Sequence, residues 1–175
     1  MSTVTQQETT IPAGTWASDP VHSHVGFEVR YLGVARFTGE VTDFEARLAE
    51  GELAGTARVS SIEVKDENLR AHLQSPEFFD AERHPDLTFA GTPDGEGRFA
   101  GELTIKGITR PVTLQAAVTG PVTDPYGNER YGLALEAVID RTAFGLDWNA
   151  PLPGGGFALA NDVTLKAELS LVKAA

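Results

Sequence analysis

The chain contains no cysteine, which excludes a disulfide framework, a thiolate metal site and a thiol nucleophile. Basic residues are few, because 14 lysines and arginines stand against 25 aspartates and glutamates, a formal net charge of −11. An acidic surface repels phosphate groups, so we expect no nucleic-acid partner and no docking on anionic membranes through a basic patch. No apolar run approaches the ~20 residues that span a bilayer, so no transmembrane segment is expected.

The first ten residues, MSTVTQQETT, lack the basic patch and the apolar stretch of a secretory signal peptide. We therefore expect residues 1–13 to form a flexible polar tail and the protein to be cytoplasmic. Residues 14–175 are predicted to be a single domain, which is long enough for one sizeable core.

The chain is rich in segments in which apolar and polar residues alternate. In residues 99–106 and 163–171 every second position is apolar or glycine, and the positions between them are mostly polar. A period of two is typical of a β-strand with one buried face. Turn signals such as residues 93–97 (PDGEG) and 151–156 (PLPGGG) separate such segments at short spacings. The pattern predicts an all-β antiparallel barrel or sandwich.

One segment breaks the alternation. Over residues 65–80, Leu69, His72 and Leu73 recur at helical spacing, Asp66 is a suitable N-cap, and Pro76 interrupts the pattern. We predict a helical insert between two strands, placed so that it can plug one end of a barrel.

A pair of histidines is the only candidate for a metal site. His22 and His24 are two residues apart, so they share one face of a predicted strand and could supply two ligands. No helical histidine pair or cysteine accompanies them, and turn hydrogen bonds after Pro20 explain them more simply. We predict no metal and no cofactor.

A second group contains the residue types of an acid–base pair. His72, Asp80, His84 and Asp86 cluster in sequence around the predicted helical insert. No nucleophile elbow or paired-carboxylate motif accompanies them, and such residues commonly cap a helix and tie it to a barrel. We predict no catalytic residues, and an enzyme using His72 and Asp80 stays open as the alternative.

The inferred inward faces combine aromatic residues with very small ones. The small residues are Gly39, Gly55, Ala57, Gly91, Gly101, Ala116, Ala137 and Ala167. Small residues beside large ones leave room, which favours a ligand pocket, with a closed structural barrel as the alternative. The predicted lining residues are Phe27, Val29, Phe37, Phe89, Phe99, Leu103, Leu114 and Leu135, with Phe78, Phe79, Phe144 and Trp148 near one end.

These residues resemble the YceI family of polyisoprenoid-binding, lipocalin-like proteins. The similarity runs from Trp16 to about Val172 and rests on six motifs in a fixed order. They are WxxDxxHSxVxF from Trp16, GxxxxF from Gly39, HLxSxEFFD from His72, PxLxF from Pro85, GxLTIxGITxPVxL from Gly101 and DRxxFG from Asp140. The resemblance implies an extended antiparallel barrel of about eight strands. It also implies an amphiphilic isoprenoid, such as a polyprenyl quinone, held in an apolar tunnel without an enzymatic step.

Charge guides the expectation for the head group of such a ligand. A pyrophosphate needs paired cations or a helix N-terminus at the tunnel mouth, whereas a neutral quinone or amide needs only one or two hydrogen bonds. The cations Arg30, Arg36, Lys65, Arg70 and Arg141 are scattered in sequence, so we favour a neutral head group. Candidate donors for it are His72, Trp148 or a tyrosine. The oligomeric state stays open, with a homodimer as one candidate.

Overall fold

The computed structural model describes residues 11–174, and most of the predicted tail (residues 1–13) therefore lies outside the described residues. The described part contains eleven strands: β1 (Thr15–Ser18), β2 (His24–Tyr31), β3 (Ala35–Val41), β4 (Phe44–Ala49), β5 (Glu52–Arg58), β6 (Ile62–Glu63), β7 (Asp86–Pro93), β8 (Arg98–Ile105), β9 (Ile108–Thr123), β10 (Glu129–Asp140) and β11 (Leu159–Lys173). It also contains one α-helix, α1 (Glu67–Gln74), and two 3₁₀ helices, η1 (Val59–Ser61) and η2 (Arg141–Phe144).

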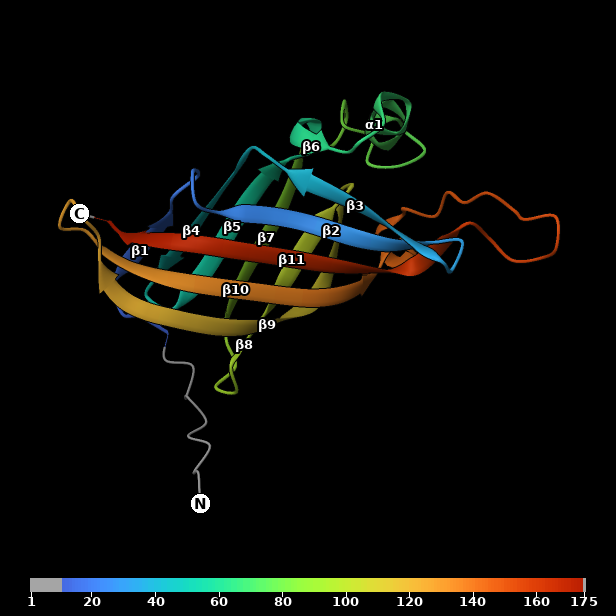
Figure 1. The fold of residues 1–175 in the computed structure, drawn as a ribbon. Coiled ribbons are helices and arrows are strands. Elements are labelled where there is room, and N and C mark those ends of the chain that lie inside the picture. The colour runs from blue at the N-terminus through green and yellow to red at the C-terminus, as the bar shows by residue number, and fades with distance from the viewer. Residues whose placement is uncertain (1–10, 175) are drawn as a thin grey trace, which may run out of the picture.

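Antiparallel pairing closes eight of these strands into a ring, in the order β1–β4–β5–β7–β8–β9–β10–β11. The short strand β1 completes the ring because it pairs on both sides. Its Trp16 lies opposite Leu48 of β4 and opposite Lys173 of β11. This confirms the predicted antiparallel barrel of about eight strands (Figure 1).

Along one edge, strand β11 pairs with two different strands. Its C-terminal residues pair with β1, while residues 163–168 pair with β2. Strand β2 continues into β3 and β6, so these three strands extend the sheet beyond the ring. No described helix is both long and apolar enough to cross a membrane.

The apolar residues of the predicted alternating segments are buried in the structure. On β10 every second residue from Leu133 to Ile139 is buried, and on β8 Phe99 has no exposed surface. Phe99 belongs to a cluster with Trp16 and Leu48 at the end where β1 closes the ring. The Trp16 indole donates its Nε1–H to the Ala13 carbonyl at 2.9 Å, which satisfies the one polar atom of this buried side chain.

The helical insert forms as a shorter helix than predicted. Asp66 is its N-cap, because the Asp66 carboxylate accepts a hydrogen bond from the Leu69 N–H at 2.9 Å. The helix ends at Gln74 rather than near residue 80, because Ser75 is extended and Pro76 has no N–H to continue the ladder. The following residues form turns, in which the Phe79 N–H donates to the Leu73 carbonyl at 3.0 Å.

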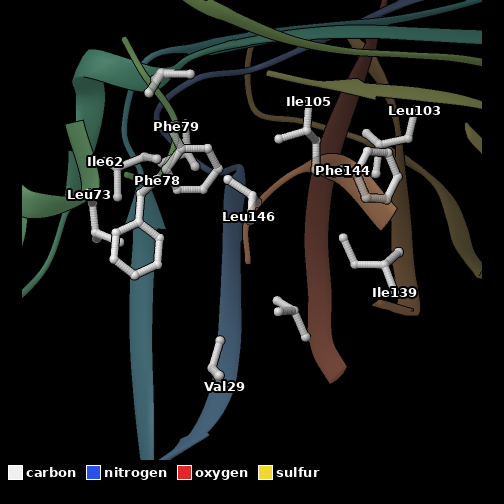
Figure 2. Packing of buried hydrophobic residues seen from close by; sticks show 13 residues of the cluster. Val29, Ile62, Leu73, Phe78, Phe79, Leu103, Ile105, Ile139, Phe144 and Leu146 are labelled. Carbon is white, nitrogen blue, oxygen red and sulfur yellow. The ribbon is translucent and has the colours of Figure 1, made fainter. Parts of the chain in front are cut away.

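The insert packs on the barrel through a second apolar cluster. In Figure 2, Leu73, Phe78 and Phe79 gather beside Ile62 on one side, and a group from the barrel wall that includes Phe144 faces them. The insert is anchored by polar contacts as well, since the Gln74 side chain donates to the Val59 carbonyl at 2.7 Å. In Figure 1 the insert lies beside β6 and above β3.

Candidate functional site

The barrel encloses a cavity of about 650 Å³, within the usual range for small-molecule sites. Its walls are the inward faces of strands from both sides of the ring, the insert, and the segment between η2 and β11. Ten of the twelve predicted lining residues border it: Phe27, Val29, Phe37, Phe78, Phe79, Phe89, Leu103, Leu114, Leu135 and Trp148. Nearly all the side chains that face this space are apolar, so water inside it would find few hydrogen-bond partners.

Phe99 and Phe144 do not border the cavity. Both face inward as expected, but Phe99 is packed among the residues that close the β1 end of the ring. Phe144 is buried in the second cluster, in η2 just beyond the end of β10. Both therefore fill the core beside the cavity. For the other ten, contact with a ligand stays a prediction.

The small inward residues divide into two kinds. Gly55, Ala57 and Ala167 line the cavity and leave space, as their size predicted. Gly39 leaves none, because a Cβ there would lie 2.4 Å from the ring of Phe27, the residue opposite it on β2. At Gly101 a Cβ would lie 2.2 Å from the Ala90 carbonyl oxygen. These glycines permit close packing instead of creating room.

One end of the cavity carries an aromatic and polar cluster around His72. The His72 ring packs edge-on against Trp148 (4.5 Å between centroids) and Phe78 (4.8 Å), and all three residues line the cavity. The His72 Nε2 lies 2.5 Å from Oε2 of Glu77. This contact occupies Nε2 and leaves Nδ1 as the ring's other polar atom.

The four residues of the predicted acid–base group do not converge. His72 is bound to Glu77, whereas the Asp80 carboxylate lies 4.0 Å from Arg83 and the Asp86 carboxylate 3.7 Å from Arg58. His84 sits against Gly107, at the turn between β8 and β9. The separate partners fit the architectural interpretation of this group.

The two N-terminal histidines also have separate partners. His22 contacts Asp19 (2.7 Å from Nδ1 to Oδ2), and His24 lies 3.4 Å from Glu40. Within residues 11–174, no three histidines, aspartates or glutamates are grouped so that they could hold a metal ion. His22 and His24 therefore have no third protein ligand grouped with them in this part of the chain.

Arg141 shapes the wall at the same end as Trp148. Its side chain is only 3% exposed and has no carboxylate within 4.0 Å among the described residues. It donates instead to the backbone carbonyls of Ala160, Leu146 and Trp148 at 2.8, 2.5 and 2.8 Å. Burial lowers the pKa of the Arg141 guanidinium below its usual value. One buried cation thus fixes both ends of the 145–158 loop.

Several wall residues in that loop were missed by sequence reasoning, which read it only as a loop. Leu146, Ala150 and Ala158 border the cavity, and so does Leu159, the first residue of β11. Asn149 holds the two sides of the loop together, since its Oδ1 accepts from the Leu159 N–H (2.9 Å) and its Nδ2 donates to the Leu159 carbonyl (2.7 Å). The sequence did contain a signal, because residues 148–158 have no charged side chain although 22% of the whole chain is charged.

The opposite end of the barrel is tied by an ion network on Arg130. Its Nε donates to Asp124 at 2.7 Å and its Nη1 to Asp19 at 2.9 Å. The hydrogen bond from Arg130, with help from the Asn128 N–H, lowers the pKa of Asp124 to about 2. Hydrogen bonds from His22 and Arg130 likewise hold the pKa of Asp19 well below its usual range.

A closed antiparallel ring around an apolar cavity defines the protein as a lipocalin-like β-barrel. Residues 16–171 match the YceI-like domain. The chain is also 32% identical over 158 residues to a UPF0312 protein of Staphylococcus aureus strain USA300, covering 85% of this chain and 92% of that protein. The protein therefore belongs to the YceI family, as its motifs predicted.

Solved structures share the fold. BcnA of Burkholderia cenocepacia superposes with a TM-score of 0.74 at 22% identity, covering 87% of this chain and 98% of that one. A polyisoprenoid binding domain from Saccharophagus degradans, implicated in plant cell wall breakdown, gives a TM-score of 0.73 at 10% identity, covering 93% of this chain and all of that one. A YceI protein of Campylobacter jejuni gives 0.68 at 24% identity, covering 90% of this chain and 96% of that one.

Proposed function

We propose that this protein binds and carries an amphiphilic isoprenoid, such as a polyprenyl quinone, with the tail inside the barrel and without catalysing a reaction on it. The observation that carries the proposal is the 650 Å³ cavity lined by aliphatic and aromatic side chains. A structural neighbour described as a polyisoprenoid binding domain supports the same ligand class.

The energy available from burial is sufficient for such a role. Each buried CH₂ group contributes ~0.8 kcal/mol, so a tail with about 20 buried carbons offers more than ~10 kcal/mol before ordering costs. Those costs remove several kcal/mol, which still leaves micromolar or tighter binding without any charged contact.

The charges around the cavity favour a neutral head group. Three cationic residues border it, but Lys166 lies near Glu28 (3.7 Å) and Arg141 is committed to backbone carbonyls. Arg36, at the exposed rim, lies 3.7 Å from the same Glu28, so no cavity-lining cation is without a partner among the described residues. A quinone needs one or two hydrogen-bond donors, and Trp148 on the cavity wall carries an indole N–H for which residues 11–174 provide no acceptor.

The direct test is lipid extraction from the purified protein followed by native mass spectrometry. We expect a co-purifying lipid in the wild type and in Ala90→Asp, because Ala90 is exposed on the outer face of β7. We expect none in Phe89→Asp, which places a carboxylate on the cavity wall one residue away. Circular dichroism checks that both variants fold. No lipid in wild type from several hosts, or equal lipid in both variants, would refute carriage in this cavity.

The head group is tested by comparing a polyprenyl quinone with a polyprenyl phosphate of equal tail length at low and high salt. We expect tighter binding of the quinone, because a phosphate meets no cluster of cations in the cavity. For the same reason salt should change the binding of either ligand little. A clear phosphate preference that weakens as salt rises contradicts the neutral head group while leaving tail binding intact.

Non-catalytic binding also makes a distinct prediction for His72, the residue on which the enzymatic alternative rests. His72→Ala should weaken ligand binding through lost contacts with Trp148 and Phe78, and the ligand should be recovered chemically unchanged from both proteins. A ligand converted by wild type and recovered intact from His72→Ala would support the enzyme instead.

A further inference from the structure

Exposed apolar side chains gather at one end of the molecule. Of the eight large hydrophobic residues that the described chain exposes, Tyr31, Leu32, Val34 and Phe157 lie on two segments, the β2–β3 turn and the 145–158 loop. Val34 is 83% exposed and Phe157 64%. Isolated exposed apolar residues are ordinary on a protein surface, but a group of four is not.

The two segments form one structural unit. The Leu32 N–H donates to the Ala158 carbonyl at 2.7 Å, and Tyr31 pairs with Leu159 across the β2–β11 ladder. In Figure 1 the turn at the end of β2 and β3 lies beside the base of the long projecting loop. We refer to residues 31–34 and 150–158 together as the apolar tip.

The apolar tip has no charged side chain of its own. The tip contains no acidic residue, although the chain carries a net charge of −11. Arg30 and Arg36 flank residues 31–34 in the chain and lie directly opposite each other across the β2–β3 ladder, whereas Asp147 precedes the 150–158 segment. Like charges at opposed positions are destabilising by themselves, and Arg30 has no carboxylate within 4.0 Å among residues 11–174. Arg36 lies 3.7 Å from Glu28 and its side chain is 64% exposed, so Arg30, which has no such partner, is the cation more available to anions from outside the protein.

The cavity extends to this tip. Tyr31, Arg36, Ala150, Ala158 and Leu159 border the cavity and belong to the tip or adjoin it. A ligand that leaves the cavity here would emerge among exposed apolar side chains and arginines instead of meeting the acidic surface found elsewhere.

We propose that the apolar tip docks on a lipid bilayer, with Leu32, Val34 and Phe157 entering the interface and Arg30 and Arg36 contacting lipid phosphates. Apolar insertion supplies most of the affinity and the two arginines add to it on anionic membranes. The overall acidic charge disfavours a broad basic patch, and this contact does not need one. The proposal rests on the proposed function for its purpose: the lipid would enter and leave the cavity without crossing water.

The test is flotation of the protein with vesicles of phosphatidylcholine alone and with 30% phosphatidylglycerol. The test variant is the double substitution Val34→Glu and Phe157→Glu. The matched control, Val122→Glu and Tyr126→Glu, alters two similarly exposed apolar residues (61% and 89%) at the β9–β10 hairpin, the other end of β10. We expect the test variant to lose at least tenfold in vesicle partition coefficient and the control to stay within twofold of wild type. Anionic vesicles should bind wild type more tightly, and salt should reduce only that increment.

Cavity binding is measured separately, with a farnesyl-substituted benzoquinone in the absence of vesicles. Both double variants should bind it like wild type, because none of the four residues borders the cavity. If wild type binds the quinone but not the vesicles, the docking proposal alone is overturned. An equal loss of vesicle partition coefficient in the test and control variants also overturns it. Self-association of wild type that the test variant abolishes, without vesicle binding, also overturns it in favour of a second copy. No quinone binding by any protein refutes the proposed function instead.

Discussion

Enlarging a small residue on the cavity wall distinguishes an open cavity from a packed core. Ala167 of β11 lies between Val25 of β2 and Leu135 of β10, and all three line the cavity. Ala167→Leu adds three carbons, which contribute ~2.4 kcal/mol at ~0.8 kcal/mol each if they are buried in open apolar space. Fixing the new side chain costs ~0.5–1 kcal/mol, so we expect the free energy of unfolding to rise by about 1.5 kcal/mol.

The control is Gly101→Ala, which adds a single carbon to another inward position. There the new Cβ would meet the Ala90 carbonyl oxygen at 2.2 Å and Gly91 Cα at 2.5 Å, both in the backbone. Overpacking of this kind costs ~1–3 kcal/mol. The two variants should thus change stability in opposite directions, although both enlarge a small inward residue.

The assay is urea unfolding of delipidated protein, followed by fluorescence and circular dichroism, with quinone titration of the same samples. Ala167→Leu should also weaken quinone binding at least tenfold, because the added carbons occupy the ligand's space. If Ala167→Leu destabilises the protein as much as Gly101→Ala does, the interior at Ala167 is packed and the argument for a cavity there fails.

Three further predictions concern stability. Asp124 has a folded pKa of about 2, below its ordinary 3.8, so its contribution to the free energy of unfolding is complete above about pH 4 and is lost as pH falls toward 2. Arg130→Met should flatten that part of a curve of stability against pH. An unchanged curve would contradict the ion network. Asp66→Ala removes the N-cap of α1 and should lower the free energy of unfolding by ~1 kcal/mol, with Asp66→Asn close to wild type. Phe99→Ala should cost ~3–5 kcal/mol, and a loss below 1 kcal/mol would show that Phe99 is not in the core.

Alternation predicted the side of the wall on which a residue lies, but not its height along the barrel. Phe99 and Leu103 share the inward face of β8, yet Leu103 borders the cavity and Phe99 lies in the closed end. The difference depends on where β1 seals the ring, and that closure joins residues more than 150 positions apart in the chain (Trp16 and Lys173), which no local pattern encodes.

The size of a residue did not predict whether it leaves open space in the cavity. Gly39 and Gly55 are indistinguishable in the sequence pattern, but the ring of Phe27 covers Gly39 while Gly55 faces the cavity. The loop that completes the wall has no periodicity at all. Its position follows from Arg141, whose three backbone contacts join Leu146, Trp148 and Ala160 and depend on tertiary structure alone.

The double role of β11 has a consequence for biosynthesis. Both β1 and β2, the first strands in the chain, need β11 as a partner, and β11 is the last strand that the ribosome produces. At about 5–20 residues per second, the inward faces of the early strands wait many seconds for the residues that seal them. During that time the nascent chain exposes the same apolar surface that later lines the cavity. The barrel of a newly made molecule can therefore close only at the end of synthesis, and until then its sheet is open.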